Sequence, residues 1–374
     1  MAFFHGLGGA ALNITGRKPD YREKGILLMR EFQFSVTELG EVESVLEAVA
    51  TAHGAVDADF LETAPAYAQR MPLRLREALA DFRHREREAV FLARGFRVDD
   101  ALVGDTPGHW RETLDGGRTP REEFFLLLCA SLLGEAFGWA SQQGGRIVNE
   151  VVPIKEDAEV QINSSSSAGL LWHTEDAFHP DRADYIGLMC IRNPDRTATT
   201  VACVDDVEVA DEDVSVLFAN RFTFRPDDAH LPRNGLGGAA SADRESDPEA
   251  RLQRRAHLRI AQMVERPEKV SVLFGDPRHP YVRLDSDAIV RDPQDPMAAD
   301  ALARFMAGMN AKLREVRLEQ GDLLFVDNYR SVHGRAPFEA RFDRGDRWLK
   351  RVNITRDLRR SRDARASATS RVIY

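Results

Sequence analysis

Two side chains with metal-binding chemistry lie close together near the middle of the chain. His173 and Glu175 are two positions apart in Trp-His-Thr-Glu-Asp. On an extended strand such residues point to the same face, so an imidazole and a carboxylate can reach one ion. A third candidate, His333, follows the β-like stretch 322–328. Two histidines and one carboxylate form the facial triad of oxygen-activating iron(II) sites, which keeps coordination positions open.

Spacing alone leaves rivals for each ligand. His179 in Phe-His-Pro competes with the other histidines, and Asp176 competes with Glu175. A short pair of histidine and acid is a weak signal, because a single histidine is more often a hydrogen-bonded structural residue. The residues themselves therefore leave the ligand set open.

Four strings together are more specific than any one of them. They are Leu-Trp-His173-Thr-Glu175-Asp-Ala-Phe, Arg182-Ala-Asp-Tyr185, Asp327-Asn-Tyr-Arg-Ser-Val-His333-Gly-Arg335 and Asp346-Arg347-Trp-Leu-Lys-Arg351. In order and spacing they resemble the signatures of the clavaminate synthase-like amino-acid hydroxylases, over residues 60–362. The resemblance implies an iron(II)- and 2-oxoglutarate-dependent dioxygenase that uses O2, with iron held by His173, Glu175 and His333. It also implies a mainly β fold with flanking helices (α+β), built on a double-stranded β-helix (jelly-roll, cupin-like) core.

The cosubstrate needs a cation for its free carboxylate. A planar guanidinium binds a carboxylate bidentately, and Arg347 matches the family arginine with that task. Thr200, in Ala-Thr-Thr-Val, matches a hydroxyl that contacts the same cosubstrate. The resemblance therefore predicts a 2-oxoglutarate site at Arg347 and Thr200.

An amino-acid substrate is expected to be held at its α-carbon end. Arg351 follows Arg347 by four positions, so the two share a face on a strand, and by resemblance Arg351 meets the substrate carboxylate. Gln142 matches a contact of the α-amino group, where Glu175 could also accept a hydrogen bond. Ser164, or Asn163 in the neighbouring register, matches a further substrate contact.

The side chain of the substrate is indicated by two alternating acids. Asp285 and Asp287, in Leu-Asp-Ser-Asp, match the acids that embrace the guanidinium in the family's arginine hydroxylases, such as that of viomycin biosynthesis. Two carboxylates suit a fixed positive guanidinium better than an amide. We therefore expect hydroxylation of free L-arginine, with C3 favoured over C4, in specialised-metabolite or antibiotic biosynthesis. Citrulline, enduracididine or another free amino acid is the alternative.

Other activities fit these residues less well. Halogenation needs an open iron position for halide, which Glu175 would fill. A metal-binding β-helix protein without turnover, or an oxygenase of protein side chains, would not need both the cosubstrate arginine and the substrate residues Arg351, Asp285 and Asp287.

Helices dominate the first third of the chain and strands the rest. Apolar spacing predicts helices from residue 37 and over 72–87, 122–137 and 296–313, and a buried strand over 89–96. Short β-rich runs are predicted at 147–154, 184–192, 199–204, 270–274, 281–284, 322–326 and 348–354. Residues 226–254 are polar and aperiodic, which is typical of a lid insert. Residues 1–28 are interpreted as a disordered extension or leader before a single domain, 29–374.

The composition limits the classes of molecule that the chain is expected to bind. The chain has 374 residues and a net charge of −9, which disfavours nucleic acid and anionic membranes. Its three cysteines lie in apolar runs without metal-type spacing, as in a reducing compartment. We expect a cytoplasmic monomer or weak homodimer that binds a small amino acid.

Overall fold

The architecture is built around a large mixed β-sheet. The computed structural model describes residues 29–114, 117–230 and 248–374. The sheet has eight strands in the order β1-β2-β13-β6-β15-β3-β16, with β4 paired to β15. β1 runs parallel to β2 and β16 parallel to β3, and the other pairs are antiparallel. The strands are β1 (Met29–Gln33), β2 (Val90–Arg94), β3 (Glu135–Trp139), β4 (Val148–Val151), β6 (Tyr185–Arg192), β13 (Leu323–Asp327), β15 (Trp348–Thr355) and β16 (Val372–Ile373).

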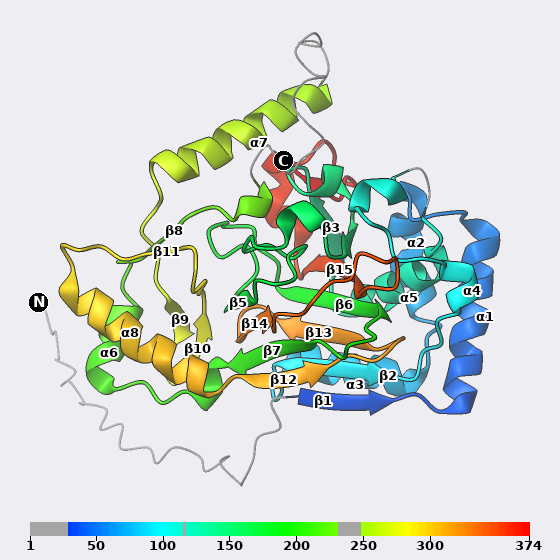
Figure 1. The fold of residues 1–374 in the computed structure, drawn as a ribbon, viewed down its shortest axis with the longest axis horizontal. Helices are drawn as coiled ribbons and strands as arrows, with labels where there is room; N and C mark the ends of the chain where they lie inside the picture. The colour runs from blue at the N-terminus through cyan, green and yellow to red at the C-terminus, as the bar shows by residue number, and fades with distance from the viewer. Residues whose placement is uncertain (1–28, 115–116, 231–247) are drawn as a thin grey trace, which may run out of the picture.

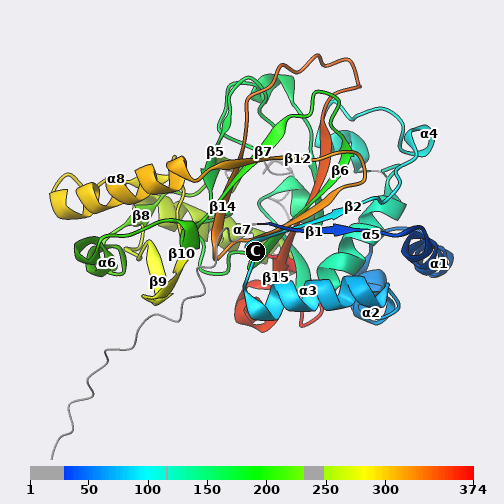
Figure 2. The same ribbon diagram turned by 90° about the horizontal axis from the view of Figure 1, so that it is seen from below.

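Helices cover one face of this sheet. They are α1 (Val36–Ala52), α2 (Ala58–Ala68), α3 (Leu73–Arg85) and α5 (Pro120–Ser131), with the short α4 (Asp100–Val103) at one side. Helix α1 starts in a capping box, in which Ser35 and Glu38 each bond the other's backbone N–H. Alternate β2 residues face the two layers, so Phe91 packs under the helices and Leu92 packs on the opposite face. Figures 1 and 2 show these helices grouped beside the sheet.

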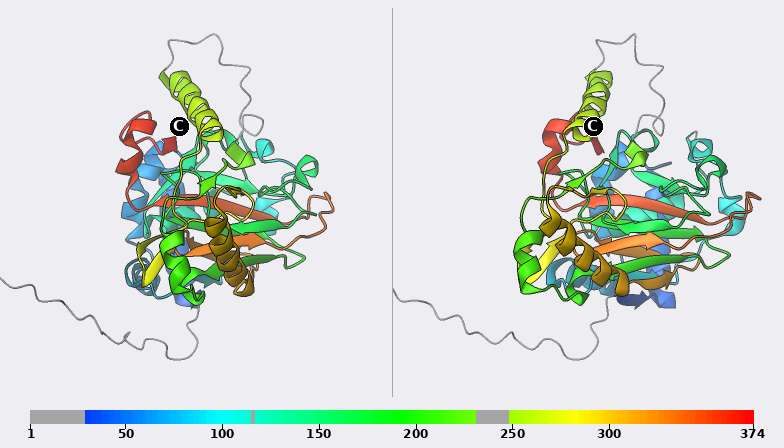
Figure 3. Two further views of the ribbon diagram at one scale, coloured as in Figure 1. Left: turned by 90° about the vertical axis from the view of Figure 1, so that its left-hand side faces the viewer. Right: turned by 60° about the vertical axis from the view of Figure 1, so that its left-hand side comes forward.

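A second, smaller sheet faces the first. Its order is β12-β7-β14-β5, with strands β5 (Leu170–His173), β7 (Ala198–Cys203), β12 (Arg314–Arg317) and β14 (Ser331–Arg335). Val201 of β7 packs in the same buried cluster as Ile186, Leu324 and Leu349 of the large sheet. The two sheets therefore close on a shared core, and Figure 3 shows their strands as stacked layers.

The end of the molecule beyond the small sheet has its own apolar cluster. It is formed by α6 (Asp211–Leu217), α8 (Pro296–Ala311) and the paired strands β8 (Thr223–Phe224) with β11 (Ile289–Val290) and β9 (Leu273–Asp276) with β10 (His279–Val282). Helix α7 (Pro248–Glu265) lies at the periphery (Figure 1).

Two sequence expectations need correction. The predicted helix 122–137 ends at Ser131, and residues 135–139 form β3 instead. Gly134 lies between them, and a Cβ there would be 2.3 Å from the Thr355 carbonyl oxygen, so only glycine allows the close approach of β3 to β15. The other helices predicted at 37, 72–87 and 296–313 are confirmed by α1, α3 and α8. The predicted strand 270–274 begins later, at Leu273.

Some expectations fall on residues outside the described part of the chain. The proposed leader, 1–28, lies there, as does most of the proposed lid, 231–247. Of the remainder of that polar stretch, residues 248–254 belong to α7. No helix in the described ranges is both long and apolar enough to cross a membrane.

Candidate active site

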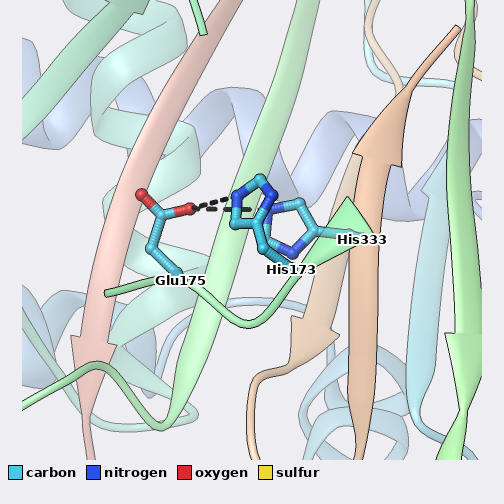
Figure 4. A group of neighbouring side chains, drawn as sticks. All are labelled: His173, Glu175 and His333. Atoms are coloured by element: carbon cyan, nitrogen blue, oxygen red, sulfur yellow. Dashed lines mark ion pairs between the residues drawn. The ribbon is translucent and has the colours of Figure 1, made fainter. Parts of the chain in front are cut away.

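The three predicted metal ligands come together at the small sheet, in a pocket that Leu188 and Leu349 of the large sheet also line. His173 ends β5, Glu175 follows it, and His333 lies on the adjacent β14, directly opposite His173 in the strand register. Their ligand atoms all lie within 4.8 Å of one another. Glu175 Oε2 is 3.6 Å from His173 Nε2 and 3.4 Å from His333 Nε2, as Figure 4 shows. Strand pairing thus brings residues 160 positions apart to a single point.

The donor atoms fit a metal ion. His173 Nδ1 lies 2.8 Å from the Leu171 carbonyl oxygen, and donation of the Nδ1 proton there would leave Nε2 as the ligand atom for a bound ion. All three side chains are buried. Burial opposes the charge of Glu175, but the Arg351 guanidinium holds the pKa of its carboxyl group well below the usual range. The cluster therefore presents an anionic oxygen and two ring nitrogens, the donor set of a non-haem iron(II) site.

The rival ligands are engaged elsewhere. Asp176 accepts hydrogen bonds from Trp139 Nε1 at 2.6 Å and lies 2.7 Å from His230 Nε2. His179 Nδ1 accepts the Asp181 N–H at 3.0 Å, and its ring packs on Trp139. Neither side chain joins the cluster, which supports Glu175 and His333 over both.

Arg347 lines the same pocket as the metal cluster and is available for an anion. Its side chain is 6 % exposed, and its Nε has no hydrogen-bond partner among the described residues. Burial lowers the pKa of its guanidinium to about 10, still well above neutrality. A buried cation without a counter-charge is costly unless a ligand supplies one. This arrangement suits the free carboxylate of 2-oxoglutarate.

The threonine beside Arg347 is Thr199, where the sequence comparison predicted Thr200. Thr199 is buried and lines the pocket, and it shares its face of β7 with Val201, which packs between the sheets. Thr200 is absent from the pocket wall and its hydroxyl lies over Gly334, on the opposite face. Side chains alternate along a strand, so a one-residue shift in the assignment moves the hydroxyl out of the site.

Arg351 reaches the predicted substrate side of the pocket. One guanidinium nitrogen donates to Glu175 Oε1, and another donates to Gln142 Oε1 at 2.7 Å and to Asn149 Oδ1 at 3.1 Å. Gln142 is 4 % exposed. The structure therefore brings Arg351, Glu175 and Gln142 together, as expected, and adds Asn149, for which no sequence motif had indicated a role.

The serine-rich loop forms another wall. Asn163 lines both the metal pocket and a neighbouring pocket, and Ser164 lines only the neighbouring one. Ser164 Oγ donates to Asp157 at 2.6 Å, so its hydroxyl is already engaged. Of the two registers considered, Asn163 is the one that faces the metal pocket.

The predicted acid pair does not line the pocket. Asp285 Oδ1 accepts the backbone N–H groups of Asp287 and Ala288, each at 2.9 Å, so this carboxylate closes a turn. Asp287 is exposed. Asp285 does lie beside the metal cluster, because it pairs with His173 in an isolated bridge. The predicted clamp of two acids is therefore not formed on the pocket wall in this structure.

Asp227 is a pocket carboxylate that the sequence did not single out. It lines the metal pocket, and burial raises the pKa of its carboxyl group to about 6. Its Oδ1 accepts the Ala229 N–H at 2.8 Å, and its carbonyl oxygen accepts the His230 N–H at 3.0 Å. The His230 ring is buried and lies 2.7 Å from Ser141 Oγ and 2.9 Å from Gln142 Nε2. Residues 226–254 were interpreted only as a lid because they lack periodicity, and that criterion cannot detect an inward-facing acid.

Comparison with known proteins identifies this arrangement. Residues 122–353 match the family described as taurine catabolism dioxygenase TauD, TfdA family. The chain is 41 % identical to an enduracididine beta-hydroxylase of Streptomyces hygroscopicus, over 90 % of this chain and 97 % of that protein. It is 42 % identical to an L-ornithine/L-arginine 3-hydroxylase of Catenulispora acidiphila, over 85 % and 92 % respectively.

A solved structure and a more distant relative agree. The non-heme iron oxygenase OrfP, in complex with Fe, succinate and (3S)-hydroxy-L-Arg, superposes with a TM-score of 0.85 at 36 % identity, covering 92 % of this chain and 100 % of that one. Clavaminate synthase 2 of Streptomyces clavuligerus is 30 % identical over 80 % of this chain and 84 % of its own length. The resemblance drawn from the four sequence strings is thereby confirmed.

Proposed function

We propose that this chain, which belongs to the taurine catabolism dioxygenase TauD, TfdA family, hydroxylates C3 of free L-arginine with iron(II), 2-oxoglutarate and O2. One observation carries the proposal: the cluster of His173, Glu175 and His333 shares a single pocket with two buried arginines, Arg347 and Arg351. Those two cations suit the free carboxylate of a 2-oxo acid and the carboxylate of an amino acid, on either side of one metal.

The protein's part in the reaction is binding, orientation and exclusion of water. A bound iron(II) supplies activation of O2, coupled to conversion of 2-oxoglutarate to succinate and carbon dioxide. Arg347 and Thr199 would hold the free carboxylate of 2-oxoglutarate. Arg351 would hold the substrate carboxylate, with Glu175 Oε1 and Gln142 accepting from the α-amino group. Because the reacting carbon is fixed relative to these α-substituents, a carbon near them faces the metal.

The substrate side chain is proposed to carry a cation. Asp227 on the pocket wall and Asp285 beside His173 place negative charge next to the metal cluster. Asp287 would have to turn inward to complete the predicted pair. Support also comes from the names of the relatives, which act on enduracididine, ornithine and arginine. Hydroxylation at the β-carbon, C3, agrees with both names and with the (3S)-hydroxy-L-Arg bound to OrfP.

The rival activities are less well supported. The carboxylate of Glu175 fills the ligand position that a halide would need, which favours hydroxylation over halogenation. A non-catalytic metal-binding β-helix protein would not require Arg347, a buried cation without a counter-charge among the described residues. Citrulline, enduracididine and other free amino acids remain the alternative substrates, with C4 the alternative position.

The wider setting follows from the same proposal. We assign the two facing sheets to a double-stranded β-helix core within one domain, 29–374. We further propose a cytoplasmic monomer or weak homodimer that serves specialised-metabolite or antibiotic biosynthesis, with no nucleic-acid or membrane partner.

A substrate panel tests the proposal. Succinate formation would be measured with iron(II), 2-oxoglutarate and, in turn, L-arginine, L-ornithine, L-citrulline, enduracididine and L-asparagine. We expect L-arginine to stimulate succinate formation most among the standard and ureido amino acids. Preference for citrulline or asparagine would reject a cationic side chain, and no stimulation by any free amino acid would reject the substrate class.

A further inference from the structure

A third buried guanidinium, that of Arg335, lines the metal pocket and has no part in the proposed reaction. Arg335 ends β14, two residues after His333, and is 5 % exposed. Its Nη2 donates to Ser165 Oγ at 2.7 Å and to the Ala168 carbonyl oxygen at 2.8 Å, and its Nη1 donates to the Ser166 carbonyl oxygen at 3.3 Å. The guanidinium also packs over the ring of Phe338. The Arg335 side chain thus bonds to three residues of one short loop.

That loop, residues 162–169, forms the wall on the substrate side. Ile162 and Asn163 line the metal pocket, and Ser164 lines the pocket next to it. The loop has no helix or strand of its own. Its backbone is held by the N–H groups of Ser166 and Ala168, which both donate to the Ala158 carbonyl oxygen. Arg335 provides the side-chain link from this loop to the strand that carries His333.

The charge of Arg335 is not compensated within the protein. Every acceptor of its guanidinium is a neutral oxygen, and no carboxylate of the described residues lies within ion-pair distance. Arg347, which lines the same pocket, also forms no ion pair in the described ranges. The two buried guanidinium groups repel each other, and a bound dianion such as 2-oxoglutarate would reduce that repulsion.

We propose that Arg335 is a positioning residue that couples binding of 2-oxoglutarate to binding of the amino-acid substrate. Resting on the proposed function, the inference is that the dicarboxylate compensates Arg335 as well as Arg347, which fixes the Arg335 guanidinium and with it the loop 162–169. The loop is then already ordered when the amino acid binds, so the amino acid binds more tightly. By linkage, the amino acid strengthens 2-oxoglutarate binding by the same factor.

If Arg335 only stabilised the loop, its removal would loosen the loop to the same extent with and without 2-oxoglutarate. Losing a coupling residue removes the effect of one ligand on the other. The experiment must therefore compare the protein with and without the first ligand, 2-oxoglutarate.

The first experiment is hydrogen exchange of the loop without any amino acid. Exchange of the peptide covering residues 157–170 would be followed in anaerobic iron(II) protein, with and without saturating 2-oxoglutarate. In the wild type we expect 2-oxoglutarate to slow exchange at Ser166 and Ala168 by at least about threefold, which is a free-energy change below that of one hydrogen bond. In Arg335→Met the slowing is expected to vanish. Absence of slowing in the wild type, or its persistence in Arg335→Met, overturns the proposal.

The second experiment measures the coupling directly by equilibrium dialysis of labelled L-arginine against the anaerobic iron(II) protein. We expect 2-oxoglutarate to tighten arginine binding by about 5-fold or more in the wild type, within the usual range of such couplings. The factor should fall to near one in Arg335→Met and to an intermediate value in Arg335→Lys, which keeps the charge but not the planar fork. Equal factors in wild type and Arg335→Met overturn the inference.

A matched control separates this effect from general loss of an arginine. Arg192 also donates to several oxygens, those of Thr106, Gly104 and Asp100, but it lies outside the metal pocket. Arg192→Met should keep both the exchange response and the coupling factor. If L-arginine binds no form of the protein, the proposed substrate fails, and the exchange experiment, which uses no amino acid, still decides on Arg335.

Discussion

Arg351 donates a hydrogen bond from its guanidinium to Glu175, the acid of the metal cluster. The two oxygens of that carboxylate have different neighbours, because Oε2 faces His173 and His333 while Oε1 faces Arg351. The metal site and the predicted substrate site are therefore joined through a single side chain.

Replacing Arg351 should affect the amino acid more than the cosubstrate. Arg351→Lys is expected to raise the KM for L-arginine by about 10-fold or more, because a charge-assisted hydrogen bond contributes roughly 1.5–3 kcal/mol. The KM for 2-oxoglutarate should change little, since Arg347 is left intact. Steady-state kinetics with each ligand varied in turn would check this. A larger effect on 2-oxoglutarate than on arginine would reverse the proposed assignment of the two arginines.

The neighbouring threonines of β7 provide a matched pair for the cosubstrate site. Thr199→Val removes the hydroxyl that lines the pocket and should raise the KM for 2-oxoglutarate by about 10-fold, the cost of one hydrogen bond to a charged group. Thr200→Val makes the same chemical change on the opposite face and should leave that KM within about twofold, well under the 1.4 kcal/mol that a factor of ten represents. The opposite ranking would restore Thr200 as the contact.

Metal binding should depend on the cluster and not on the rival histidine. His173→Ala and His333→Ala are expected to lose tight iron(II) binding, measured anaerobically by dialysis and elemental analysis. His179→Asn keeps an acceptor for the Asp181 N–H and should bind one equivalent of iron, as a facial triad with all its ligands present. Loss of iron from His179→Asn, with retention in His333→Ala, is incompatible with the assigned triad.

Lys350 provides a test of stability separate from the site. It is fully buried on β15 and donates to Glu123 at 2.8 Å and to Glu150 at 2.5 Å. Lys350→Met leaves Glu123 and Glu150 with only Arg146 as a cation, at 3.9 Å and 3.7 Å. The loss of the buried partner should lower the free energy of unfolding by about 3 kcal/mol, the lower end of the cost of breaking a buried pair. Urea denaturation would measure it, with Lys312→Met, an exposed substitution, expected to change stability by less than about 0.5 kcal/mol.

The same acids offer a rescue. Adding Glu123→Gln and Glu150→Gln to Lys350→Met removes the two carboxylate charges that lost Lys350, so much of the lost stability should return. If the triple variant is no more stable than Lys350→Met, the loss has another origin than buried charge.

The parts of the site that depend on strand geometry were predictable from the sequence. Arg347 and Arg351 were expected on one face because four positions is an even step, and both line the pocket. Lys350, at an odd step, points away toward Glu123 and Glu150. The pairing of His173 with His333 across β5 and β14 could be predicted only through the family resemblance, since no local pattern encodes contacts at such separation.

The predictions that differ from the structure depend on register or on loop conformation. Thr200 was predicted from a motif match, which carries no information on which face of the strand is buried, and a shift of one residue exchanges the two faces. The helix 122–137 extended too far because an apolar run fits a buried helix and a buried strand equally well. Asp285 and Asp287 lie in a turn whose backbone N–H groups engage the first carboxylate, a contact that alternating spacing does not predict.

The most direct test of the central claim is to identify the product of L-arginine under isotopically labelled oxygen. With iron(II), 2-oxoglutarate and ¹⁸O2, mass spectrometry and NMR should find one labelled oxygen atom on C3 of arginine, with one succinate formed for each hydroxyarginine. Labelled oxygen on C4 would contradict the assigned position. Succinate formed without any labelled arginine would contradict the assignment of L-arginine as the substrate.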